Sequence, residues 1–147
     1  MRILDSDILS YALHDQSPAH PYAWEVVEKG LLGEIELFLT PTTILETYNV
    51  LFRFYRIRSL ERLLEKLALT ISGLKVVEPS ITGLDVSLSD SIPLGDGFLI
   101  ATALNHRIPV IVSNDSHILN RAPKHGLITE NPIPEGVRGK LARWKGE

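Results

Sequence analysis

Short apolar segments alternate with longer segments of helical periodicity along most of this 147-residue chain. Apolar runs of strand length occur at residues 3–4, 36–39, 75–77, 109–112 and 127–128. Helical patterns occupy residues 18–32, 41–55, 60–71, 80–90 and 94–106. Strands that are separated by helices pair in parallel, because each helix returns the chain to the same end of the sheet. The pattern predicts an α/β fold, namely a three-layer α/β/α sandwich with a central parallel sheet of four to five strands.

Two of the predicted helices carry start signals. Thr40 is a candidate N-cap for the helix at residues 41–55, and Pro41 suits its first position. The hydroxyl of Ser59 is the candidate cap for the next helix, at residues 60–71.

The length and the 44% hydrophobic content allow one compact domain and are too small for two ordinary ones. We expect that domain to span residues 1–130. Residues 131–147 contain prolines, glycines and scattered basic residues, which predicts a loosely attached C-terminal tail.

The residue types that are scarce or absent exclude several classes of protein. There is no cysteine, which excludes disulfides, thiolate zinc sites and cysteine nucleophiles. No apolar run approaches membrane-spanning length, so we expect a cytoplasmic protein without a membrane partner. The single glutamine and single methionine favour a thermophilic source.

Acidic residues follow two of the predicted strands. Asp5 ends the first strand, and Asp115 follows the strand at residues 109–112. Right-handed crossovers place the carboxyl ends of parallel strands on one edge of a sheet, which is where open α/β sheets have their active sites. Each aspartate could also serve only as the N-cap of the helix that follows it. The residues alone leave both interpretations open.

Asp96 lies on the same helical face as Leu99, Ile100 and Ala103. A carboxylate at the start of a buried apolar stripe needs a partner. The flanking glycines, Gly95 and Gly97, would let another group approach the backbone closely, although they could also mark a simple turn. This favours a functional role for Asp96 over capping.

Glu46 lies off the apolar stripe of its helix, on the side of Asn49 and Arg53. Periodicity alone predicts a solvated residue paired with Arg53. Its place soon after a strand nevertheless puts it near the same edge of the sheet as the aspartates.

If these four acids meet, each ionised pair at about 5 Å repels by roughly 3 kcal/mol at an effective dielectric constant near 20. Protons or divalent cations would relieve the repulsion. The five histidines are dispersed without metal-ligand spacing, so we expect oxygen ligands and a hard ion, Mg²⁺ or Mn²⁺.

Four segments in order resemble the motifs of the PIN domain family, the metal-dependent ribonuclease fold that includes VapC-type toxins. They are LDSDIL, TTILETYNVL, LGDGFLIATAL and VIVSNDSHI. The resemblance implies Asp5, Glu46, Asp96 and Asp115 as catalytic metal ligands, with Ser6, Asp7, Ser113 and Asn114 in support. It also implies RNA hydrolysis with Mg²⁺ or Mn²⁺, a homodimer and, for the VapBC-type toxins, an antitoxin partner.

A net charge of −3 and a pI near 5.9 argue against RNA binding by a general positive field. Neutralising the four acids changes the formal charge to +1, so an RNA substrate remains compatible. Candidate RNA contacts are Arg53, Arg56 and Arg58, which interleave with aromatic residues, and Arg121 and Lys124 after Asp115. The alternative is that Phe52 and Tyr55 are core residues and that the arginines of the first group are solvated helix ends paired with Glu61 and Glu65.

Other functions are also compatible with parts of the pattern. A PIN domain could process RNA without an antitoxin or bind RNA without cutting it. The DSD segment also resembles the first motif of haloacid-dehalogenase-like phosphatases. That family needs a further acid where this chain has Ile100 and Ala101, and its lysine is hard to place.

Overall fold

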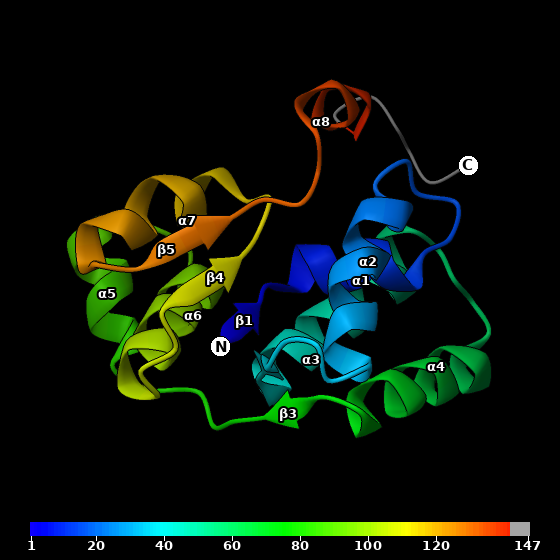
Figure 1. Ribbon diagram of the computed structural model, residues 1–147, viewed down its shortest axis with the longest axis horizontal. Coiled ribbons are helices and arrows are strands. Elements are labelled where there is room, and N and C mark those ends of the chain that lie inside the picture. The colour runs from blue at the N-terminus through cyan, green and yellow to red at the C-terminus, as the bar shows by residue number, and fades with distance from the viewer. Residues whose placement is uncertain (142–147) are drawn as a thin grey trace.

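A five-stranded parallel sheet forms the centre of the protein, seen here in a computed structural model that describes residues 1–141 (Figure 1). The strand order is β3-β2-β1-β4-β5. The strands are β1 (Arg2–Leu4), β2 (Leu37–Leu39), β3 (Lys75–Val76), β4 (Val110–Val112) and β5 (Ile128–Glu130). All neighbouring strands are parallel, which confirms the predicted sheet.

The central strand, β1, pairs with β2 on one side and β4 on the other. Ile3 is opposite Phe38 and Ile111 in this register, and Leu4 is opposite Val112. The chain builds the sheet outward in one direction through β3 and then in the other through β5. The reversal lies between β1 and β4, and α/β proteins place ligands at the carboxyl ends of strands at such a point.

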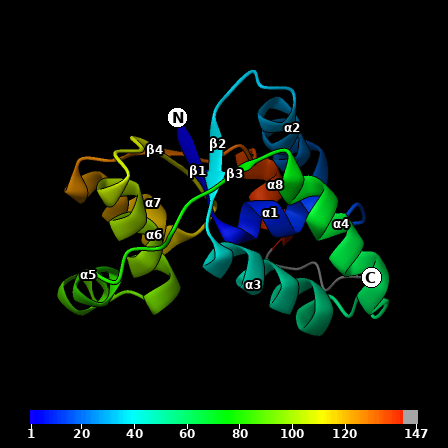
Figure 2. The ribbon, with the colours of Figure 1, turned by 90° about the horizontal axis from the view of Figure 1, so that it is seen from below.

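Helices cover both faces of the sheet, which confirms the three-layer sandwich (Figure 2). The N-terminal half supplies α1 (Ser6–Leu13), α2 (His20–Leu31), α3 (Pro41–Asn49), the π-helix η1 (Val50–Phe54) and α4 (Leu60–Ser72). The C-terminal half supplies α5 (Gly83–Asp90), α6 (Leu94–Asn105), α7 (Ser116–Arg121), the 3₁₀ helix η2 (Ala122–His125) and α8 (Glu135–Leu141). Among residues 1–141, no helix has the length and apolar character needed to cross a membrane.

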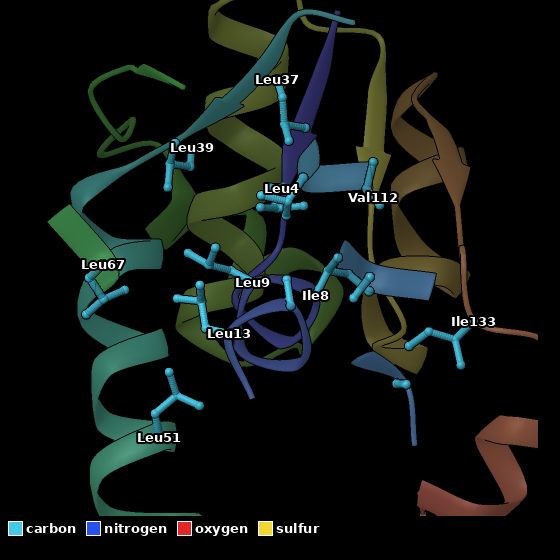
Figure 3. Packing of buried hydrophobic residues seen from close by; sticks show 14 of the residues in the cluster. Leu4, Ile8, Leu9, Leu13, Leu37, Leu39, Leu51, Leu67, Val112 and Ile133 are labelled. Carbon is cyan, nitrogen blue, oxygen red and sulfur yellow. The ribbon is translucent and has the colours of Figure 1, made fainter. Parts of the chain in front are cut away.

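Two hydrophobic clusters lie on opposite faces of the sheet, because successive strand residues point to opposite sides. Leu4 and Val112 pack with apolar residues of α1, α2 and α4 (Figure 3). Ile3 and Ile111 pack on the other face with α6 and α7. The sheet is therefore buried on both faces, and its carboxyl edge carries the polar loops.

The helix predicted over residues 41–55 changes its hydrogen bonding halfway. Thr40 caps it as expected, since its Oγ1 accepts the Thr43 amide at 3.1 Å. Beyond Asn49 the chain forms the π-helix η1, in which the Tyr55 amide donates to the Val50 carbonyl at 3.0 Å. Ser59 occupies the N-cap position of α4 as expected, but the capping bond predicted for its hydroxyl is not made.

The expectation of a loosely attached tail is wrong for residues 131–141. Ile133 is completely buried in the cluster that contains Leu4, and Val137 and Leu141 pack against the same cluster. The Arg138 guanidinium donates to the Ile133 carbonyl at 2.7 Å. This segment is part of the folded domain. Residues 142–147 lie outside the described structure.

Candidate metal centre

Asp5 stands at the carboxyl end of β1 and is only 7% exposed. Its Oδ1 accepts the Ser6 amide at 2.7 Å, so it does cap α1. Its Oδ2 accepts the Ser113 hydroxyl at 2.6 Å, which ties it to the end of β4. Capping uses one oxygen and the neighbouring strand uses the other, so the two interpretations of Asp5 are compatible.

Asp115 follows β4 and is held next to Asp5 by a short chain of hydrogen bonds. The Ser113 hydroxyl, which donates to Asp5, accepts the Asp115 amide at 2.9 Å. Oδ1 of Asp115 accepts the His117 amide at 2.7 Å and caps α7. Ser113 is completely buried, and its two hydrogen bonds set the relative position of the two aspartates.

Asp96 and Glu46 approach from two different helices. Asp96 is in the first turn of α6 and is 9% exposed. A β-carbon at the preceding residue, Gly95, would fall on Oε2 of Glu46 and lie 3.2 Å from its Cδ. The Glu46 carboxylate thus rests against the backbone of α6 beside Asp96. The prediction of a solvated Glu46 paired with Arg53 is wrong, since no ion pair joins them within residues 1–141.

The electrostatics of these acids show that they share one site. Burial raises the pKa of Asp5 to about 6, and the charge of Asp115 adds to the effect. Burial, followed by the charges of Asp5 and Asp115, raises the pKa of Glu46 to about 7. Burial also raises the pKa of Asp96 to about 7, with further contributions from Asp115, Asp5 and Glu46. The structure therefore brings all four acids within electrostatic range of each other.

The donor atoms fit a divalent cation. One ligand atom each from Asp96, Asp115 and His117 lie within 4.8 Å of one another. Carboxylate oxygens suit Mg²⁺ and Mn²⁺, and a crowded set of carboxylates with raised pKa values gains from a cation that replaces its protons. His117 was missed by the sequence analysis, which considered only spacing between histidines. The signal that could have found it is its place two residues after Asp115.

Asp7 and Asn114 link the two loops that carry the aspartates. Oδ1 of Asp7 accepts the Ile8 amide at 2.7 Å, and Oδ2 accepts the Asn114 amide at 3.0 Å. Burial, followed by the charge of Asp5, raises the pKa of Asp7 well above its ordinary value. Asn131 donates to Oδ1 of Asn114 at 2.8 Å, so the C-terminal segment also supports this loop. Nothing in the local sequence around Asn131 predicted that contact.

Ser6 contributes to the site through its backbone. Its carbonyl accepts the Ser10 hydroxyl at 2.7 Å and the Thr47 hydroxyl at 3.4 Å. The shorter bond of the Thr47 hydroxyl, at 2.8 Å, goes to the Thr43 carbonyl in its own helix, which is the helix that carries Glu46.

The two groups of basic residues lie at different places. Arg53, Arg56 and Arg58 are exposed at the end of η1 and in the connection to α4. Arg121 and Lys124 lie where the chain enters β5, near the amino edge of the sheet, because Ile128 of β5 donates to the Pro109 carbonyl just before β4. Helix α7 therefore carries the chain away from Asp115 before it reaches the second group.

The fold and the site together define an α/β protein with a cluster of buried acids at the switch point of a parallel sheet. The PIN domain family model matches residues 2–124, and the chain belongs to that family. No curated protein matches the chain significantly.

Two solved structures share the fold. The crystal structure of PAE2754 from Pyrobaculum aerophilum is 23% identical, covers 97% of this chain and 94% of its own, and has a TM-score of 0.62. The second is the crystal structure of VapBC2 from Rickettsia felis bound to a DNA fragment from their promoter. It is 17% identical, covers 88% of this chain and 97% of its own, and has a TM-score of 0.65.

Proposed function

We propose that this protein is a divalent-metal-dependent endoribonuclease whose site is formed by Asp5, Glu46, Asp96 and Asp115. The observation that carries the proposal is the convergence of these acids, from four separate segments, within electrostatic range of one another in a PIN-domain fold. Buried carboxylates that raise one another's pKa are costly without a cation. A fold that keeps them together supports a metal-binding role.

Mg²⁺ or Mn²⁺, when bound, would supply Lewis acidity toward the phosphate and lower the pKa of a coordinated water. Neighbouring side chains hold the four acids in place. Ser113 fixes the Asp5 carboxylate, and Asp7 holds the loop of Asp115 through the Asn114 amide. Thr47, one residue after Glu46, lies with its hydroxyl 3.4 Å from the Ser6 carbonyl at the start of α1.

An RNA substrate is compatible with the acidic composition of the protein. The formal net charge is −3, and neutralisation of the four acids by a cation would leave +1. Repulsion of a phosphate backbone therefore falls when the ion is present. Added divalent metal should therefore increase RNA hydrolysis in two ways, by supplying the ion for the reaction and by reducing the repulsion of the RNA backbone.

We further propose that the protein is the toxin component of a VapBC-type pair, located in the cytoplasm. Support comes from the likeness to the Rickettsia felis VapBC2 structure. An apolar groove of about 340 Å³ between α3 and α4 offers a surface for an apolar segment of an antitoxin. It is lined by Pro41, Ile44, Leu45, Tyr48, Leu64 and Leu67. Purification together with the product of the adjacent reading frame would test this part.

A homodimer belongs to the same proposal. Ile81, Leu84 and Leu88 form an exposed apolar stripe along α5 and the turn before it, with spacings of three and four residues. Exposed leucines of this kind favour burial against a second copy. Light scattering on the purified protein, with Leu88→Lys as the variant, tests the assembly independently of activity.

The decisive experiment is Asp96→Asn, with cleavage of single-stranded RNA and calorimetric Mn²⁺ binding as the two measurements. We expect the variant to lose both while its circular dichroism stays unchanged. The matched control is Asp85→Asn, which removes an exposed acid from the first turn of the neighbouring helix α5. Undiminished cleavage in both Asp5→Asn and Asp96→Asn would refute the assignment.

A further inference from the structure

Residues 52–58, with the sequence FRFYRIR, form a surface that we call the arginine–aromatic corner. It contains three arginines and three aromatic residues and no acid. It spans the end of η1 and the start of the connection from α3 to α4, a connection visible at the lower right of Figure 2. The acidic site described above uses none of these side chains.

The corner exposes groups that a folded protein usually hides or pairs. Phe54 is 68% exposed, and Arg53, Arg56 and Arg58 are exposed as well. Within residues 1–141, no ion pair involves any of these arginines, so the expected pairing with Glu61 and Glu65 is wrong. The other part of that alternative is confirmed, since Phe52 and Tyr55 pack against the core cluster. The arginines keep their charge available for a partner of opposite sign.

The rings of the corner are held in fixed positions. The Arg58 guanidinium lies 5.2 Å from the centre of the Phe52 ring, and Phe52 stacks on Tyr48 at 5.6 Å with an interplanar angle of 8°. Phe54 meets the ring of Tyr55 edge-on at 5.0 Å. A preorganised aromatic surface loses little entropy on binding, which favours a planar ligand such as a nucleobase.

Tyr55 joins the corner to α1. Its ring packs against His14 at the end of that helix, with centroids 4.9 Å apart. Burial and then the charge of Asp7 raise the pKa of Tyr55. The corner therefore lies against the end of α1, the helix that Asp5 caps at its start.

Arg56 occupies a backbone conformation that arginine disfavours. Its φ is +57°, at the end of η1, where the Ile57 amide returns to the Leu51 carbonyl at 2.9 Å. Helix ends of this kind usually carry glycine, and a larger residue there costs about 1 kcal/mol. Strained residues are retained where they serve a function.

We propose that the arginine–aromatic corner binds single-stranded RNA, with a base stacked on Phe54 and backbone phosphates on the arginines. The inference rests on the proposed nuclease function. A single strand is required because a base within a duplex has no free face for the ring.

The first test changes the ring of Phe54. Binding of a fluorescein-labelled single-stranded RNA is measured by anisotropy in an Asp96→Asn background, which prevents cleavage. Phe54→Leu should weaken binding about tenfold, because it keeps an apolar side chain but removes the stacking face. Phe54→Trp should bind the RNA as tightly as Phe54 does, because it keeps a stacking face. Leu32→Ala, at an equally exposed position (66%) before β2, is the control and should change nothing.

The second test separates binding from stability. Arg56→Gly should weaken RNA binding and reduce the slope of log affinity against log salt by about 0.7 for each phosphate that the variant no longer neutralises. It should not lower the melting temperature, since it relieves backbone strain. Arg107→Gly is a close control, because Arg107 is also exposed, has φ of +56°, and lies at the opposite edge of the sheet before β4.

The outcomes distinguish this inference from the nuclease proposal. If Phe54→Leu and Arg56→Gly bound RNA as tightly as the wild type, the proposal that the corner binds RNA would be wrong, even if the native protein cleaves RNA. The corner would then be a surface for a protein partner. Tight binding that depends on the corner, together with no cleavage by the native protein, would overturn the nuclease and support the corner.

Discussion

The buried hydroxyl of Ser113 donates a 2.6 Å hydrogen bond to Oδ2 of Asp5, a residue 108 positions earlier in the chain. The same hydroxyl oxygen accepts the amide of Asp115 at 2.9 Å. One side chain therefore holds two of the four acids, across the switch point of the sheet. Because the bond is made to the charged form of Asp5, it opposes the effect of burial and lowers the pKa of that carboxyl.

Ser113→Ala should consequently shift metal binding to higher pH. Without the hydroxyl, the pKa of Asp5 rises above its present value of about 6, so protons compete with the cation over a wider range. We expect Mn²⁺ affinity to fall at pH 6 and to recover at pH 8. Calorimetric titration at several pH values measures the shift.

Thr102→Val is the matched control for Ser113→Ala. The Thr102 hydroxyl is equally buried, donates to the Phe98 carbonyl at 2.6 Å and accepts the Ser80 amide at 3.0 Å, but touches no acid. Each variant should cost about 1 to 3 kcal/mol of unfolding free energy, because a buried group is left without its partner. Only Ser113→Ala should move the pH profile; an equal movement in both would contradict the role of Ser113.

Without divalent metal, the protein should become less stable as the pH rises from about 4 to 8. Asp5, Glu46 and Asp96 have raised pKa values, of about 6, 7 and 7, so the folded state binds more protons than the unfolded state in this window. Stability then decreases with pH. Thermal unfolding with EDTA should show the decrease.

Added Mg²⁺ should remove most of that pH dependence, because a cation replaces the protons and stabilises the folded state that binds it. Asp96→Asn should flatten the metal-free curve and abolish the stabilisation by Mg²⁺. A metal-free melting temperature that rises between pH 5 and pH 8 would contradict the crowding of these carboxylates.

Gly95→Ala should weaken metal binding without removing any ligand. The new β-carbon would clash with Glu46 Oε2, so the flexible end of that side chain must move from its present position. The fold should survive, since alanine suits a helix better than glycine. Mn²⁺ affinity measured by calorimetry should fall severalfold.

The control for Gly95→Ala is Gly139→Ala in α8, where a β-carbon meets no atom within 4 Å. It should leave Mn²⁺ affinity unchanged and raise the melting temperature slightly, through helix propensity alone. If Gly95→Ala bound Mn²⁺ like the wild type, Glu46 would not need its present position.

The sequence could predict the sheet and the aspartates at its strand ends, because these depend on chain order and handedness alone. Asp5 and Asp115 follow adjacent strands, so parallel topology places them together. The position of Glu46 depends on how α3 is turned against α6, which the periodicity of a single helix does not contain. The π-helix η1 likewise arises from one shifted hydrogen bond, without a change in the apolar pattern. A thermophilic source stays a prediction.

Ile133 is a case of burial that the prediction of a loose tail missed. It stands between two prolines, and Val137 and Leu141 follow it at a helical spacing of four residues. It is completely buried with Leu4 and Val112. Ile133→Ala should lower the unfolding free energy by about 2 to 5 kcal/mol, through the missing transfer energy and a residual cavity. Denaturant titration measures the change.

Ile81→Ala is the control for Ile133→Ala, because Ile81 is 72% exposed and its truncation should cost less than about 0.5 kcal/mol. The effect of Ile133→Ala should also appear in metal binding, since the segment that Ile133 anchors begins at Asn131, which bonds to Asn114 beside Asp115. If Ile133→Ala were as stable as Ile81→Ala, residues 131–141 would be an appendage and not part of the domain that forms the site.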